Sequence, residues 1–186
     1  MRDSLLLVND VTGYGRVSTF AMLPILTQYG LHPYILPTAL VSNTLDYGTS
    51  ETLDTTDFMQ SAIAKWDELG FSFDCISIGF ITNDRQVPII LDLIHKQDKP
   101  FVFVDPIMAD DGKLYPDMYP GAIECNRQLA SVANIIMPNI TEAKILTGLF
   151  EDKDILSDDE CQELIDALRA FGPEKQIGRA SCRERV

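Results

Sequence analysis

Short apolar runs alternate along the chain with longer segments in which apolar residues recur every third or fourth position. The short runs predict buried strands at residues 5–9, 34–40, 75–81, 101–104 and 135–137. The longer segments predict helices at about 17–29, 58–69, 87–94, 122–132, 139–146 and 157–171. This alternation is typical of a three-layer α/β sandwich with a mainly parallel sheet and right-handed crossovers.

Glycines and polar residues mark where the predicted elements end. Gly13 and Gly15 predict a tight turn after the first strand, and the polar segment 42–50 predicts a loop. Three pairs have the spacing of a capping box, in which two side chains bond to the first backbone N–H groups of a helix. These pairs are Asn83 with Gln86, Asn139 with Glu142, and Ser157 with Glu160.

Composition narrows the classes of partner. The 186 residues are 46% hydrophobic and 23% charged, with a formal net charge of -13. This charge argues against nucleic acid and against anionic membrane as partners, because both attract clustered Lys and Arg. The four cysteines form no CxxC pair and no cluster with histidine, so neither a zinc site nor a redox motif is indicated. We therefore expect a cytoplasmic protein whose cysteines are reduced and mostly serve packing.

The last ten residues, 177–186, differ from the rest of the chain. They read IGRASCRERV, with three arginines and one glutamate, and without them the formal charge would be -15. The codon string ATC GGA AGA GCG TCG TGT AGG GAA AGA GTG encodes them and resembles a common sequencing adapter. We predict a non-native tail on residues 1–176, which form the N-terminal part of a single domain; the alternative is a native basic arm.

Polar residues that could carry chemistry follow several predicted strands. Ligands of parallel sheets bind at the carboxyl ends of the strands, so we expect these residues to share a cleft. They are Asn9 and Asp10, the segment 38–44, the segment 80–83, the segment 105–111, and Asn139 with Glu142.

Each motif among these residues has a structural alternative to its functional interpretation. Gly13-Tyr14-Gly15 could approach a phosphate, yet it lacks the Walker A pattern and is more often a plain turn. The acidic segment from Asp105 to Asp111 could hold Mg²⁺ through water or could be a solvated loop. Asn139 and Glu142 could join a metal–phosphate network, although their spacing favours a simple capping box.

Taken together, four segments resemble the pyridoxal (vitamin B6) kinase group of the ribokinase-like superfamily. Asp105-Pro106-Ile107-Met108 resembles its DPVMGD segment, and the segment from Met137 through Glu142 to Gly148 resembles its TPNxxEAxxLTG segment. Val41-Ser42-Asn43-Thr44 with Tyr47-Gly48 resembles its FSNHTxYG segment, and Gly79-Phe80-Ile81 resembles its GYLG segment. The likeness covers about residues 4–172.

The resemblance implies ATP-dependent phosphorylation of a hydroxymethyl group on pyridoxal, pyridoxamine or pyridoxine, with Mg²⁺ as cofactor. It assigns Asp105, Asp110, Asn139 and Glu142 to the metal–phosphate network. It assigns Asn9, Val41, Thr44 and Phe80 to the pyridine pocket. It also implies a homodimer. The catalytic base of the group lies in a GxGD motif, which these 186 residues lack, so we expect the chain as it stands to be inactive.

Departures from the motifs leave the substrate open. Asn9 stands where the group usually has serine, Phe80 where it has tyrosine, and Ala109 where it has glycine. The segments 10–13 and 38–40 also resemble hydroxymethylpyrimidine kinases of thiamine synthesis. That kinase is one alternative function, and a non-catalytic α/β ligand-binding domain is another.

Overall fold

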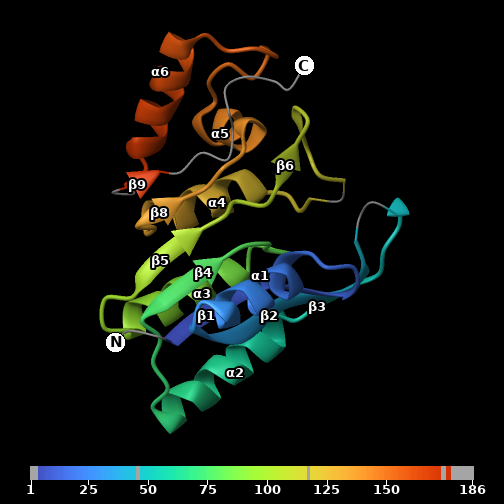
Figure 1. Cartoon of the computed structure of the whole chain (residues 1–186), viewed down its shortest axis with the longest axis vertical. Helices are drawn as coiled ribbons and strands as arrows, with labels where there is room; N and C mark the ends of the chain where they lie inside the picture. The colour runs from blue at the N-terminus through green and yellow to red at the C-terminus, as the bar shows by residue number, and fades with distance from the viewer. Residues whose placement is uncertain (1–3, 45–46, 117, 173–174, 177–186) are drawn as a thin grey trace. The chain divides into compact units, whose positions relative to one another are not determined.

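The computed structural model describes residues 4–44, 47–116, 118–172 and, for the backbone alone, 175–176. The predicted non-native tail, 177–186, lies outside the described residues. The chain divides into two compact units, Met1–Phe101 and Val102–Val186 (Figure 1).

The first unit is built on a sheet with strand order β3-β2-β1-β4. Its strands are β1 (Ser4–Tyr14), β2 (His32–Asn43), β3 (Thr52–Asp54) and β4 (Cys75–Ile78). β1 pairs in parallel with both β2 and β4, and β3 adds to β2 in the antiparallel sense. β1 therefore has a paired strand on each side. Its apolar run from Leu5 to Val8 is buried, as expected for a parallel strand in a sheet that is covered on both faces.

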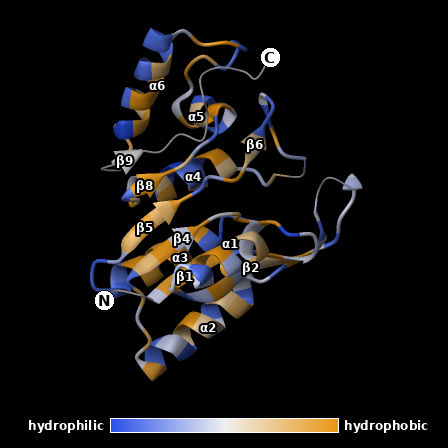
Figure 2. Cartoon of the chain, in the orientation of Figure 1, coloured by the Kyte–Doolittle hydropathy of each residue, from blue (hydrophilic) through white to orange (hydrophobic). Residues whose placement is uncertain are grey.

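Three helices pack on this sheet: α1 (Ser18–Gln28), α2 (Thr56–Leu69) and α3 (Gln86–Lys96). α1 contacts β1 and β2, whereas α2 contacts β2 and α3. Hydrophobic and hydrophilic residues alternate along α2 (Figure 2), as expected for a helix with one buried side. α2 ends at Gly70, whose φ of 70° is a left-handed conformation that favours glycine.

The second unit contains three parallel strands in the order β5-β8-β9. They are β5 (Phe101–Val104, whose first residue closes the first unit), β8 (Ile135–Ile136) and β9 (Lys175–Gln176). A separate antiparallel hairpin joins β6 (Ala109–Asp110) to β7 (Lys113–Leu114). β5 and β8 carry hydrophobic colours in Figure 2.

The helices of the second unit are α4 (Ala122–Ser131), α5 (Ile140–Thr147) and α6 (Asp158–Arg169). Their fully buried leucines, Leu129 of α4 and Leu146 of α5, contribute to its core. Two predicted capping boxes are confirmed: Asn139 with Glu142 begins α5, and Ser157 with Glu160 begins α6. In each, the cap side chain accepts from the third backbone N–H and the glutamate bonds back to the cap.

Some local predictions are wrong. β1 does not turn at Gly13 but continues to Tyr14, because its pairing with β2 continues past Asn9 after a shift of register. The capping box predicted for Asn83 and Gln86 is absent. Instead, Asn83 Oδ1 accepts from Arg85 N–H at 2.9 Å and Gln86 Oε1 accepts from Thr82 N–H at 3.1 Å.

The predicted fold class is confirmed at the level of its architecture: strands and helices alternate, and most strand pairs are parallel. The single-domain boundary at residue 176 stays a prediction. None of the helices in the described ranges is long and apolar enough to cross a bilayer.

Candidate functional site

Asn9 ties β1 to the segment that follows β4. Its side chain is buried, with 4% of the residue exposed, and its Oδ1 accepts from the N–H groups of Asp10 (3.0 Å) and Phe80 (2.9 Å). Because N–H groups only donate, these two bonds decide which end of the amide is the oxygen. Two of the predicted pyridine-pocket residues, Asn9 and Phe80, are therefore in direct contact.

Gly79 makes this contact possible. A Cβ atom at this position would lie 2.6 Å from Asn9 Oδ1 and 2.7 Å from Asn9 Cγ, closer than real Cβ contacts. The Gly79 N–H donates to the Val8 carbonyl at 2.9 Å, which holds the ends of β1 and β4 together. Any larger residue would push Asn9 away from the Phe80 N–H.

β2 reaches the same segment through Thr38. Asn9 pairs with Pro37 and Val11 pairs with Leu40, so β2 has one more residue than β1 over this stretch, as in a β-bulge. Next to this irregularity, Thr38 Oγ1 donates to the Phe80 carbonyl at 2.7 Å. Asn9 and Thr38 together bind both backbone polar groups of Phe80.

The other two predicted pocket residues lie further along β2. Val41 pairs with Thr12, and the Thr44 N–H donates to the Tyr14 carbonyl at 3.1 Å. Gly15, with φ of 134°, is needed here, because a Cβ would lie 2.2 Å from the Thr44 side chain. Val41 and Thr44 thus lie beside the 12–15 end of β1, and both are half-buried.

The segment Gly13-Tyr14-Gly15 does not lead directly into a helix. Gly13 and Tyr14 belong to β1, and α1 begins only at Ser18. Both sequence-based interpretations, a plain turn and a phosphate loop, place this segment after the strand. In the structure, Gly13 and Tyr14 are the last residues of β1.

In the second unit, Asn139 and Glu142 hold the segment that precedes the hairpin. Glu142 is fully buried; its Oε2 accepts from Asn139 N–H at 2.8 Å and its Oε1 from Met108 N–H at 3.3 Å. Asn139 Nδ2 donates to the Ala109 carbonyl at 2.7 Å. The pair therefore has a structural task besides any role in binding phosphate.

Asp110 is carried by the β6–β7 hairpin. The turn is Asp111-Gly112, with φ values of 49° and 76°, the signs expected for a type I′ turn. Asp110 is exposed, and its Oδ1 accepts from Asp111 N–H at 3.0 Å. An Asp-Gly pair is a strong hairpin signal, so this element could have been predicted from the sequence. Asp105 lies just after β5 and is half-buried.

The carboxylates of Asp105 and Asp110 are compatible with Mg²⁺, which does not need a site built from protein ligands alone. Among the described residues, no three His, Cys, Asp or Glu side chains gather closely enough to hold an ion. Mg²⁺ usually takes one or two carboxylates and completes its shell with water and substrate phosphates. The exposed carboxylate of Asp110 could serve as one such ligand of Mg²⁺. The carboxylate of Glu142 already accepts hydrogen bonds from two backbone N–H groups.

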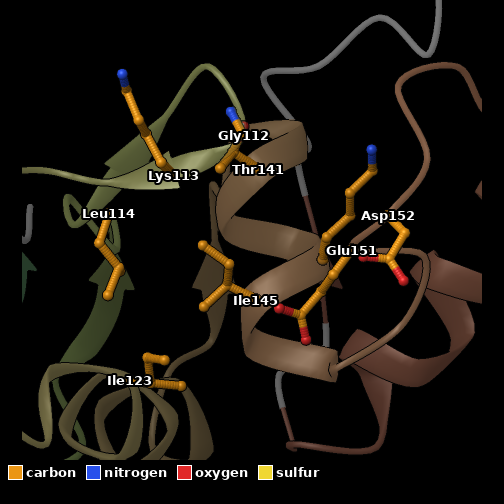
Figure 3. Close-up of a pocket in the computed structure, with 9 residues that line it drawn as sticks. Gly112, Lys113, Leu114, Ile123, Thr141, Ile145, Glu151 and Asp152 are labelled. Atoms are coloured by element: carbon orange, nitrogen blue, oxygen red, sulfur yellow. The ribbon is translucent and has the colours of Figure 1, made fainter.

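A pocket of about 360 Å³ lies beside the β6–β7 hairpin in the second unit, with Gly112 of the hairpin turn and Thr141 of α5 among its lining residues. Figure 3 shows its labelled side chains coming from β7, α4, α5 and the segment after α5. The lining contains two lysines, Lys113 and Lys144, and two carboxylates, Glu151 and Asp152, so it has no dominant charge. None of the four residues predicted for the metal–phosphate network lines it.

Two buried polar residues lie near Phe80: Thr38, which belongs to the predicted strand-end segment 38–44, and Gln86, which no prediction named as a site residue. Thr38 and Gln86 are both 0% exposed, and a hydrogen bond of 2.8 Å joins Gln86 Nε2 to the Thr38 carbonyl. Asp54 lies close to this group. Burial raises the pKa of its carboxyl, but hydrogen bonds from Thr56 and Asn83 lower that pKa more strongly.

Comparison with known proteins identifies the family. The sequence profile described as phosphomethylpyrimidine kinase matches residues 21–180. The chain belongs to this family. The pyridoxine/pyridoxal/pyridoxamine kinase of Bordetella avium, for example, is 31% identical over 147 residues, which make up 73% of this chain and 48% of that protein.

Solved structures of similar proteins share the fold of this chain. A candidate phosphomethylpyrimidine kinase of Bacteroides thetaiotaomicron, crystallised with pyridoxal, is 33% identical, with a TM-score of 0.90 over 96% of this chain and 63% of that one. The pyridoxal kinase of Lactobacillus plantarum is 29% identical, with a TM-score of 0.83 over 91% and 60%. The chain spans less than half the length of the curated relatives that it matches: 35% of a pyridoxal kinase-like protein of Schizosaccharomyces pombe and 48% of the Bordetella avium kinase.

Proposed function

We propose that the chain is the N-terminal part of an ATP-dependent kinase that phosphorylates the hydroxymethyl group of pyridoxal, pyridoxamine or pyridoxine. The observation that carries this proposal is the fold similarity, with a TM-score of 0.90, to a relative that was crystallised with pyridoxal. The buried contact between Asn9 and Phe80, two residues assigned to the pyridine pocket, supports it.

In this proposal the first unit holds the ring of the substrate. Asn9 has its oxygen engaged by two backbone N–H groups, so the amide nitrogen is its remaining polar group. Phe80 presents an aromatic ring that suits a flat heterocycle. Val41 and Thr44 would complete the pocket along β2.

The second unit would supply groups for the nucleotide. Phosphoryl transfer depends mainly on positioning and on neutralising the charge of the phosphates. We assign Mg²⁺ to the carboxylates of Asp105 and Asp110, and the shaping of that segment to Asn139 and Glu142. When bound, Mg²⁺ would neutralise phosphate oxygens of ATP. The catalytic base is expected in a GxGD motif beyond the present residues, so the 186-residue chain would transfer no phosphate.

A substrate panel tests the proposal. The protein from the complete reading frame is incubated with ATP and each B6 vitamer, and with hydroxymethylpyrimidine. We expect phosphorylated B6 vitamers from the complete protein and no product from the 186-residue chain. Turnover by the 186-residue chain would contradict the prediction that a chain without the GxGD motif is inactive.

Hydroxymethylpyrimidine phosphorylation is the second candidate function. The matching family profile is described by that activity, and the buried pair Thr12 Oγ1 and Asp10 Oδ2, 2.8 Å apart, belongs to the segment that resembles those kinases. A preference for hydroxymethylpyrimidine over all B6 vitamers in the panel would favour this candidate. Retention of a ring ligand without any turnover would instead favour the non-catalytic binding domain.

We also propose that the protein forms a homodimer through α1. This helix contains no charged residue, and within it Thr19 alone is buried. Phe20 and Ile25 expose 43% and 58% of their surface. In a chain with a net charge of -13, an uncharged apolar helix is a surface where a second copy can approach without repulsion.

A further inference from the structure

Gln86, at the first position of α3, is a buried side chain whose amide joins three segments of the first unit. It is 0% exposed. Its Oε1 accepts from Thr82 N–H at 3.1 Å, and its Nε2 donates to the Thr38 carbonyl at 2.8 Å and to Thr56 Oγ1 at 3.1 Å. The side chain therefore connects the segment after β4, the strand β2 and the start of α2.

The orientation of this amide follows from its partners. A backbone N–H must face the oxygen, and a carbonyl must face the nitrogen, so a flipped amide would place like groups against each other. Both hydrogens of the nitrogen are used. Glutamate, which has the same shape, would keep the bond from Thr82 but could not donate to Thr38 while ionised.

Thr38 passes this restraint on to Phe80. Its carbonyl accepts from Gln86, and its hydroxyl donates to the Phe80 carbonyl at 2.7 Å. The Phe80 N–H is bound in turn by Asn9 at 2.9 Å. The backbone of Phe80 is thus fixed by side chains that are 71 and 42 residues away in the sequence, and Gln86 holds one of them in place.

We propose that Gln86 is a positioning residue for the ring-binding site, acting through Thr38 on the backbone of Phe80. The proposal rests on the proposed function, because it takes the ring of Phe80 to contact the substrate. Gln86 itself is fully buried and would not touch the ligand. Its loss should weaken binding of the ring substrate more than binding of ATP.

The test compares variants of the protein from the complete reading frame. For Gln86→Glu we expect the KM of the ring substrate to rise about tenfold, the size expected for a lost buried hydrogen bond, with the KM of ATP within about twofold of wild type. Gln60→Glu is the matched control, because it makes the same change at an exposed position of α2. It should leave both constants unchanged.

A second pair of variants covers the possibility that Gln86→Glu does not fold. Thr38→Val keeps the shape of the side chain and removes the hydroxyl that binds Phe80, whereas Thr38→Ser keeps that hydroxyl. We expect a raised ring-substrate KM in the valine variant and its recovery in the serine variant. A purely structural role would lower the melting temperature without this difference between the two substrates, and that result would overturn the proposal.

The wild-type panel separates this inference from the proposed function. If the protein phosphorylates hydroxymethylpyrimidine alone, the pyridoxal assignment fails, and the same variants are measured with the pyrimidine as ring substrate. If the KM of ATP and that of the ring substrate rise equally in Gln86→Glu, the positioning role fails even though the kinase assignment stands.

Discussion

At the scale of single residues, the site depends on one close approach between distant positions. Gly79 has no Cβ, and Asn9 occupies the space where that atom would be. The resulting bond between Asn9 and Phe80 joins β1 to the end of β4. The sequence places Asn9 and Phe80 at the ends of two predicted strands, but their contact across 71 positions follows only from the pairing of β1 with β4.

Gly79→Ala tests this packing. We expect the variant to lose about 1–3 kcal/mol of unfolding free energy, because the new methyl group displaces Asn9 and leaves buried N–H groups without an acceptor. The measurement is urea unfolding followed by circular dichroism. In an Asn9→Ala background the same change should cost much less, since the space is then open. Equal costs in the two backgrounds would show that Asn9 is not what excludes the methyl group.

At the scale of elements, local sequence signals were reliable where the element depends on neighbours in the chain. The boxes at Asn139 and Ser157 predicted the starts of α5 and α6, because a cap and its partner are only three residues apart. The same spacing at Asn83 predicts a capping box that does not form, because the Gln86 side chain bonds to the Thr82 N–H and to the Thr38 carbonyl of β2 instead. The length of β1 also depended on β2 and could not be seen locally.

The start of α6 gives a pH-dependent prediction. A hydrogen bond from the Lys153 side chain, followed by one from the Ser157 N–H, lowers the pKa of Glu160 from 4.5 to about 2. A carboxyl whose pKa is lowered on folding stabilises the folded state above its ordinary pKa, and this contribution is lost as pH falls through the folded value. Glu160→Gln should therefore melt at a lower temperature than wild type at pH 7.

The difference should shrink as the pH falls from about 4.5 towards 2, because protonated wild-type Glu160 then resembles glutamine. Thermal melts of both proteins at several pH values measure it. Glu163→Gln, an exposed change on the same helix, is the control. A difference in melting temperature that stays constant over this range would contradict the prediction.

At the scale of the whole molecule, the sequence predicts the α/β architecture because short apolar runs alternate regularly with longer segments of helical periodicity. It could not predict which faces stay uncovered. α1 has no charged residue and is mostly apolar, which in a sequence indicates burial, yet Phe20 and Ile25 are exposed. The homodimer proposed above would explain this difference.

Ile25→Glu tests the dimer. We expect the wild-type protein to sediment as a dimer and this variant as a monomer, because the new charges would face each other across a two-fold interface. Phe58→Glu, at a similarly exposed position of α2, should stay dimeric. A monomeric wild-type protein, or an α1 covered by residues of its own complete chain, would rule out the α1 interface.

The central claim is that the chain is the N-terminal part of a kinase whose catalytic base lies downstream. The most direct test is to read the source gene through its 3′ end, past the codon for Gln176. We predict that the native frame continues through a further strand and a nucleotide-binding loop to a GxGD motif. A native frame that ends in IGRASCRERV, residues 177–186, would contradict the claim and would favour the non-catalytic binding domain.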